Sequence, residues 1–208
     1  MLSVGMDSTR EPFVNKLLSL CLAAVGEAED PPGSNRGPAV ERYQRGFQNR
    51  YGETYIGDKW CGLFAEYQAR AAYDALGLDS SFLDRFTLAS AAAWLVMGLH
   101  LGILSATPEP GDIGALWVDH KITHVCIVKA VSADGQVHSI DGNSLNRVRE
   151  NVRNNDAVHF AAFIRLPVTA RLPPPQIQGP AVLPPVVPPW PPALLSAGGG
   201  AGTLQPGA

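Results

Sequence analysis

Four residues have the types and the order along the chain that nucleophilic catalysis needs: Cys61, His124, Asp141 and Asn143. A thiolate attacks a carbonyl group, an imidazole moves the protons, and a carboxylate or amide orients the imidazole ring. Taken singly, each residue has an ordinary alternative, because a cysteine beside Trp60 is often a small buried hydrophobe and Asp-Gly-Asn is a common turn sequence. Taken together, they predict a site with Cys61 as nucleophile and His124 as general base.

The segment after residue 60 must position the cysteine. Its large apolar residues recur at three- and four-residue spacing, which predicts an amphipathic helix, and they are Trp60, Leu63, Phe64, Tyr67 and Ala71. Asp58 is a suitable N-cap and Gly77 a suitable end. Cys61 then falls in the first turn, where free N–H groups, the helix dipole and nearby Lys59 favour a thiolate.

A β-hairpin must bring the histidine to its acceptor. A β-prone strand runs from His124 to Val131, residues 132–135 form a turn, and a second strand returns to Asp141. If the loop has an even number of residues and no bulge, His124 projects from the same face as Asp141 and Asn143. An odd loop or a bulge would break this inference.

The order of the elements indicates the fold class. Helices are predicted first and strands afterwards, so we expect an α+β domain in which N-terminal helices pack on an antiparallel sheet. The predicted helices cover residues 12–26, 39–47, 60–76 and 90–98, and the predicted strands cover 113–117, 124–131, 136–141 and 159–166. We expect this domain to span residues 13–167, after a flexible lead at 1–12.

Residues 168–208 differ sharply in composition from the rest, with blocks of prolines followed by glycines. Proline blocks donate no backbone hydrogen bonds, so this tail is predicted to be a disordered linker. The alternative is a docking segment for a partner with an aromatic groove.

Composition excludes several other classes. The formal charge is -3, from 16 basic and 19 acidic residues, and no basic stripe is present, so neither nucleic acid nor an anionic membrane surface is an expected partner. Residues 86–106 lack Asp, Glu, Lys and Arg but include His100 and two glycines, so a short buried helix is expected there rather than a membrane span. Cys21, Cys61 and Cys126 match no zinc pattern or disulfide framework.

Several motifs in this order resemble the CHAP family of papain-like peptidoglycan amidohydrolases, which are close in architecture to the NlpC-type cell-wall peptidases. The resemblance covers about residues 13–167. It rests on Asn-Arg-Gly-Pro-Ala-Val-Glu-Arg-Tyr at 35–43, Trp-Cys-Gly-Leu-Phe at 60–64, Pro-Gly-Asp-Ile at 110–113, His-Val at 124–125 and Asp-Gly-Asn-Ser at 141–144.

The resemblance implies the papain-like CHAP fold, with Cys61 as nucleophile and His124 as general base. Asp141 stands where the family has glutamate, one methylene longer, so Asp141 and Asn143 are both expected to hold the ring, Asp141 through water. The backbone N–H of Cys61, helped by Tyr55, is expected to stabilise the oxyanion. The positions that match the family's calcium loop carry no run of acidic ligands, so neither metal nor cofactor is expected.

The activity implied is hydrolysis of an amide in bacterial peptidoglycan through a thioester acyl-enzyme, by an N-acetylmuramoyl-L-alanine amidase or an endopeptidase. The alternatives are a cysteine hydrolase that acts on another amide as a secreted toxin, and a catalytically silent binding module of a phage particle. The expected place of action is the cell wall, outside the cytoplasm. No classical signal peptide is recognised, which favours phage lysis or a dedicated export route.

Overall fold

The computed structural model describes residues 10–52, 54–118, 121–156 and 159–168, which all belong to the first, 1–175, of two units into which the chain divides. The predicted tail therefore lies almost entirely outside the described residues. The helices are α1 (Glu11–Ala23), α2 (Pro38–Tyr51), α3 (Cys61–Ala75), the 3-10 helix η1 (Ser81–Arg85) and α4 (Ala91–Leu101). The strands are β1 (Leu104–Ser105), β2 (Ile113–Val118), β3 (Lys121–Val131), β4 (Val137–Asp141), β5 (Arg149–Arg153) and β6 (Phe160–Ile164).

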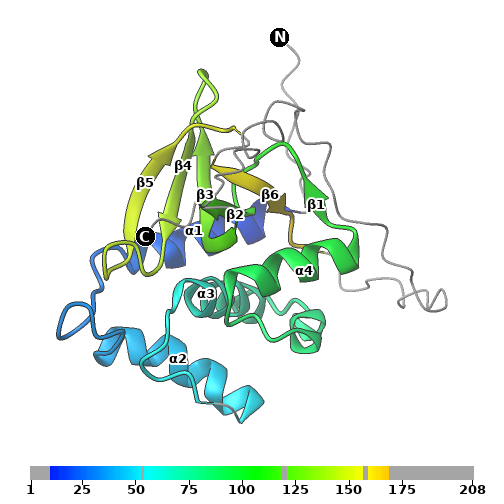
Figure 1. Cartoon of the computed structure of the whole chain (residues 1–208). Helices are drawn as coiled ribbons and strands as arrows, with labels where there is room; N and C mark the ends of the chain where they lie inside the picture. The colour runs from blue at the N-terminus through cyan, green and yellow to red at the C-terminus, as the bar shows by residue number, and fades with distance from the viewer. Residues whose placement is uncertain (1–9, 53, 119–120, 157–158, 169–208) are drawn as a thin grey trace, which may run out of the picture. The chain divides into compact units, whose positions relative to one another are not determined.

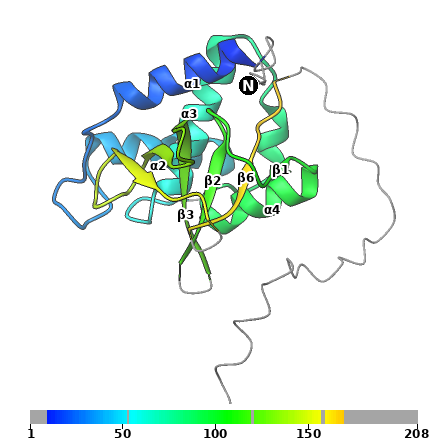
Figure 2. The ribbon, with the colours of Figure 1, turned by 90° about the horizontal axis from the view of Figure 1, so that it is seen from above.

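The strands form one sheet in the order β1-β6-β2-β3-β4-β5, and every neighbouring pair is antiparallel. Figure 1 shows α2, α3 and α4 below the strands, and Figure 2 shows α1 running beside α3. The helices precede most of the sheet in sequence and pack on it through α3 and α4. The predicted α+β class is therefore confirmed.

Helix α3 is the centre of the hydrophobic core, and its start is held by aromatic packing. The ring of Tyr43 on α2 stacks on Trp60 with 5.8 Å between centroids and meets Phe64 edge-on at 5.2 Å. All three side chains are fully or almost fully buried. Aromatic pairs in these geometries add stability beyond their buried area, so the backbone just before Cys61 has little freedom.

Some elements differ from the sequence-based expectation. Helix α1 begins at Glu11, and Arg10 before it is buried, so the end of the expected flexible lead is ordered. Strands β1 and β5 were not predicted, because β1 has two residues and the Arg-Glu-Asn-Val-Arg sequence of β5 lacks a hydrophobic face. Helix α4 is short, as predicted, and none of the described helices has the length and hydrophobicity needed to cross a bilayer.

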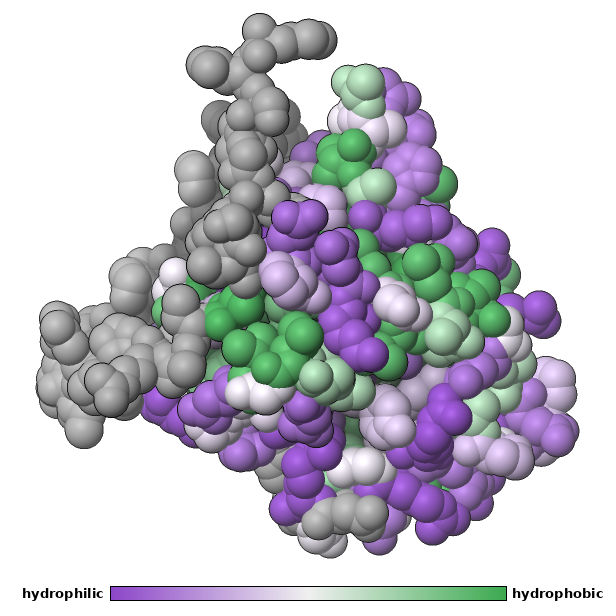
Figure 3. Space-filling view, turned by 180° about the vertical axis from the view of Figure 1, so that it is seen from behind, coloured by the Kyte–Doolittle hydropathy of each residue, from purple (hydrophilic) through white to green (hydrophobic). Residues whose placement is uncertain are grey.

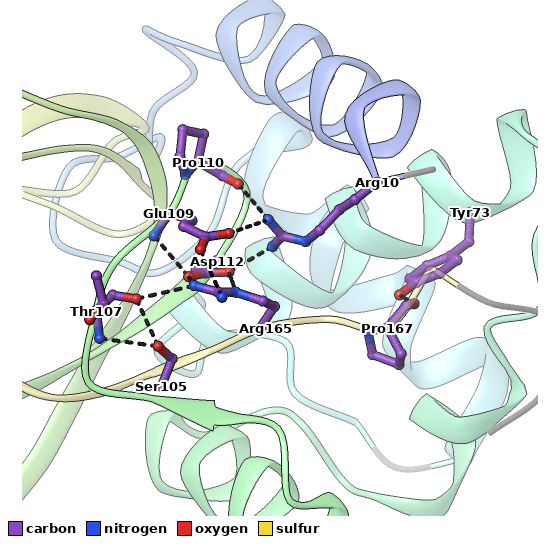
Figure 4. Close-up of polar contacts among 9 residues, drawn as sticks. All are labelled: Arg10, Tyr73, Ser105, Thr107, Glu109, Pro110, Asp112, Arg165 and Pro167. Carbon is purple, nitrogen blue, oxygen red and sulfur yellow. Dashed lines mark hydrogen bonds and ion pairs between the residues drawn. The ribbon is translucent and has the colours of Figure 1, made fainter. Parts of the chain in front are cut away.

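A buried ion-pair cluster joins both ends of the domain (Figure 4). The Asp112 carboxylate is fully buried and accepts from Arg10, which precedes α1, at 2.6 Å, and from Arg165, which follows β6, at 3.0 and 3.2 Å. Glu109 pairs with Arg165 at 2.8 Å. Two arginines from opposite ends of the sequence thus share one carboxylate, and this explains the aspartate of the Pro-Gly-Asp motif structurally.

Some hydrophobic side chains of the described residues are exposed at the surface. The side opposite to that of Figure 1 carries separate hydrophobic patches with hydrophilic residues between them (Figure 3). Scattered exposure of this kind is common on protein surfaces and identifies no partner.

Candidate active site

Cys61 is the first residue of α3 and is 6% exposed. The N-cap is Trp60, and no side chain caps the helix, so Asp58, although suited to cap by its type, does not do so. The chain continues two residues past Asp58 before the helix begins, and the Asp58 carbonyl accepts a hydrogen bond from Gln44 instead. No described residue accepts from the Cys61 N–H, which leaves this donor free for a ligand at the helix start.

Two glycines let other segments approach the start of α3. A Cβ on Gly62 would lie 2.6 Å from the Ala89 carbonyl oxygen, and one on Gly142 would lie 2.5 Å from Cβ of Phe64. Both distances are too short for a side chain, so these glycines are required by close packing. Gly142 therefore lets the end of β4 approach α3, and Gly62 lets the segment before α4 approach it.

His124 lies between the other two members of the site. Its Nε2 is 2.8 Å from Oδ2 of Asp141, and the Cys61 thiol lies close enough to the ring for the two groups to shift each other's pKa. Because Nε2 is engaged by the carboxylate, Nδ1 is the ring nitrogen left to interact with the sulfur. Cys61, His124 and Asp141 thus form one series of interacting groups, and the expectation that Asp141 reaches the ring only through water was wrong.

The hairpin of β3 and β4 brings His124 to Asp141 in a different way from the one predicted. Val131 pairs with Val137, so the loop has five residues, an odd number. A bulge then shifts the register by one before Val128 pairs with Ser139. Each feature alone would turn the side chains of one strand to the opposite face, whereas the two together cancel.

The resulting register gives both strands a shared polar face. His124 and Cys126 on β3 lie on the same side as Ser139 and Asp141 on β4. His124 and Asp141 are diagonal neighbours in this register, a spacing that a histidine ring can bridge. The predicted common face was correct for His124 and Asp141, although its stated condition of an even loop without a bulge was not met, and Asn143 lies beyond the end of β4.

The Asp141 carboxylate has two further partners that the sequence did not reveal. Its side chain is fully buried and accepts from the Ser139 hydroxyl at 2.6 Å and from Arg153 on β5 at 2.6 and 3.3 Å. Ser139 lies two residues before Asp141 on the same strand, so strand periodicity alone could have suggested it. No signal indicated Arg153, because β5 itself was not recognisable.

The three groups shift each other's ionisation. Burial raises the pKa of Cys61, but hydrogen bonding and charge from His124, with the N–H groups of Val125 and Gly62, outweigh burial and lower it. Burial likewise opposes the charge on His124, but Asp141 and Cys61 raise its pKa to about 9. Burial opposes ionisation of Asp141 too, yet His124 and Arg153 lower its pKa to about 2. The arrangement favours a thiolate beside an imidazolium.

The other two cysteines have the opposite character. Burial raises the pKa of Cys21 and of Cys126 above its ordinary value. Both are free and buried thiols, although Cys126 lies on the same strand face as His124. Cys61 is therefore the thiol with nucleophilic character.

Asn143 does not hold the imidazole in this structure. Its backbone is left-handed, with φ of 56°, and its amide lies 3.1 Å from Asn35 Oδ1. With the amide oxygen towards Trp60, it accepts from the Trp60 N–H and donates to Glu29, each at 3.2 Å. Glu29 is buried and also accepts from the Trp60 indole at 2.9 Å. Asn143 thus secures the residue before Cys61, and the expectation that it shares His124 with Asp141 is not met among the described contacts.

Tyr55 and metal binding complete the list of predicted features. The Tyr55 ring meets Phe47 edge-on at 4.9 Å between centroids, and its part in oxyanion binding stays a prediction. Within the described part of the chain, no cluster of three or more His, Cys, Asp or Glu side chains is arranged to hold a metal ion.

Comparison of the chain with protein-family models, curated proteins and solved structures gives no match.

Proposed function

We propose that this chain is a cysteine amidohydrolase of the CHAP type that cuts an amide bond in bacterial peptidoglycan. The observation that carries the proposal is the His124–Asp141 hydrogen bond beside the Cys61 thiol at the uncapped start of α3. The same three residues occupy the nucleophile, base and acidic positions in the motifs that resemble the CHAP family. The arrangement of these three side chains supports nucleophilic catalysis by a cysteine, and the resemblance to the CHAP family supports peptidoglycan as the substrate.

The reaction begins with the thiolate–imidazolium pair. Cys61 sulfur attacks the amide carbonyl carbon, and the negative charge that develops on the oxygen is stabilised by the free Cys61 N–H and the dipole of α3. His124 donates its Nδ1 proton to the leaving amine, which departs and leaves a thioester on Cys61. Neutral His124 then removes a proton from water, the resulting hydroxide attacks the thioester, and the thiolate–imidazolium pair is restored.

Asp141 acts throughout without changing its own protonation. Its hydrogen bond to Nε2 keeps that nitrogen protonated and turns Nδ1 towards the sulfur. Its charge stabilises the imidazolium, and its low pKa keeps the carboxylate ionised at neutral pH. This is the role of the acid in other nucleophile-histidine-acid sites.

The target is the amide between sugar and stem peptide or an amide within the stem peptide, and the reaction takes place at the cell wall, outside the cytoplasm. The test is incubation of the full-length protein with purified peptidoglycan, followed by mass spectrometry of the soluble fragments. A new pair of ends at one amide type is expected, and its identity gives the bond cut. Cys61→Ala should release nothing, and Cys126→Ser is the matched control that should release the same fragments. Equal release by Cys61→Ala would overturn the proposal.

A further inference from the structure

The described structure contains a partly buried cation that the reaction steps leave without a role. We propose that Arg153 is a positioning residue for the site: its guanidinium fixes the Asp141 carboxylate and balances its charge, and so limits how firmly Asp141 holds a proton on His124. The effect on turnover rests on the proposed hydrolase function. The effect on the imidazole does not.

Arg153 binds Asp141 with both terminal nitrogens. Nη2 donates to Oδ2 at 2.6 Å and Nη1 to Oδ1 at 3.3 Å. Nη1 also donates at 2.7 Å to the Ser139 hydroxyl, which in turn donates to Oδ1 of Asp141 at 2.6 Å. With His124 on Oδ2, each carboxylate oxygen accepts two hydrogen bonds, so the carboxylate cannot rotate without losing several of them.

His124 and Arg153 compete for the same oxygen atom. Both donate to Oδ2 of Asp141, at 2.8 and 2.6 Å. Without Arg153, the fully buried carboxylate would be neutralised only while His124 carried its proton, so the ring would keep the proton to higher pH. A more basic ring is a weaker acid towards the leaving amine. Arg153 therefore keeps the ring acidic enough for this step.

The other polar groups around this cluster do not take over this role. Cys61 faces the ring from α3, and Cys126 faces Asp141 from β3 as a neutral buried thiol. Arg149 is the register partner of Asp141 on β5 but makes no hydrogen bond or ion pair with it among the described contacts. Arg153 is thus the permanent cation that is bound to Asp141, and its side chain is only 17% exposed.

The direct test is the pKa of His124, measured by NMR titration of its imidazole signals in the full-length chain. A Cys61→Ala background removes the thiolate, which also acts on the ring, and a His124→Gln spectrum identifies the signal. Arg153→Met should raise this pKa by about one unit or more, because a positive charge close to the ring is lost. Arg153→Lys, which keeps the charge, should leave it within about 0.3 unit. Arg153→Gln, neutral but still able to donate to Asp141, serves if Arg153→Met does not fold.

With Cys61 restored, Arg153→Met should move the alkaline limit of kcat/KM to higher pH. It should also lower kcat by at least about tenfold at unchanged KM, a part of the roughly 10²- to 10⁴-fold that a positioned acid–base group contributes. An unchanged His124 pKa in both neutral variants, or an equal rise in Arg153→Lys, would overturn the proposal. Lack of activity on peptidoglycan would refute the proposed function but leave these pKa values as they are.

Discussion

Replacing Asp141 by alanine separates its role from that of its neighbour Asn143. The Asp141 carboxylate contacts His124 directly, whereas the Asn143 amide contacts Trp60 and Glu29. The matched variant is Asn143→Gly, because glycine removes the amide and still tolerates the left-handed backbone at this position. The two substitutions remove polar side chains only two residues apart. A difference in turnover between the two variants therefore reflects the different contacts of the two side chains and not their position in the chain.

The contacts set the expected magnitudes. Asp141→Ala removes a buried carboxylate and leaves Arg153 without its partner, which should lower the free energy of unfolding by about 3–5 kcal/mol. It also removes the group that orients His124, so turnover should fall by about 10²- to 10⁴-fold, near the level of His124→Ala. Asn143→Gly leaves the buried Trp60 N–H unpaired, which should lower the free energy of unfolding by about 1–3 kcal/mol. Turnover should stay within about tenfold of the wild type.

The assay is the initial rate on soluble peptidoglycan fragments, with urea unfolding followed by circular dichroism to show that each variant is folded. The rate at which iodoacetamide alkylates Cys61 at pH 7 reports the thiolate without any substrate. This rate should fall in Asp141→Ala, because the imidazolium that supports the thiolate is weakened. If Asn143→Gly matched His124→Ala while Asp141→Ala stayed active, the assignment of the third residue would be wrong.

The other predictions concern the cysteines, the structural ion pairs and pH. Iodoacetamide at neutral pH should modify Cys61 and spare Cys126, whose pKa is raised by burial; mass spectrometry of the peptides decides this, and faster labelling of Cys126 would contradict it. Asp112→Ala should lower the free energy of unfolding by about 3–5 kcal/mol, because two arginines lose their buried partner, and should leave kcat of the folded protein unchanged. The pKa of Asp141 falls from 3.8 to about 2 on folding, so its ionised carboxylate contributes about 2 kcal/mol of stability above pH 3.8. This contribution is lost as the pH falls to 2. Urea unfolding at several pH values should show the loss in the wild type and not in Asp141→Ala.

The sequence predicted which residues meet at the candidate site better than it predicted the local geometry that brings them together. Hydrophobic spacing placed Cys61 in the first helical turn, and strand periodicity placed His124 and Asp141 on one face. The cap was wrong because helix starts depend on packing, here the aromatic contacts of Trp60, as well as on capping propensity. The five-residue loop and the bulge were both missed, and their effects on the strand register cancel. An argument from an even or odd number of loop residues cannot detect such a cancellation.

Residues that act through tertiary contacts could not be predicted. Arg153 comes from a polar edge strand without a hydrophobic pattern, and its partner Asp141 lies 12 positions earlier. Asn143 was assigned to the ring by the resemblance, but its left-handed backbone turns it towards Glu29. Both outcomes depend on local backbone geometry and long-range pairing, which hydrophobic periodicity does not encode.

The most direct test of the central claim is detection of the acyl-enzyme. The full-length protein is mixed with soluble peptidoglycan fragments and quenched in acid after a short time, and intact-mass and peptide mass spectrometry then locate any adduct. A thioester intermediate predicts that Cys61 gains the mass of the carboxylic acid product less one water, that hydroxylamine removes this adduct, and that Cys61→Ala lacks it. Release of fragments by wild type and Cys61→Ala alike, with no adduct on Cys61, would contradict the account.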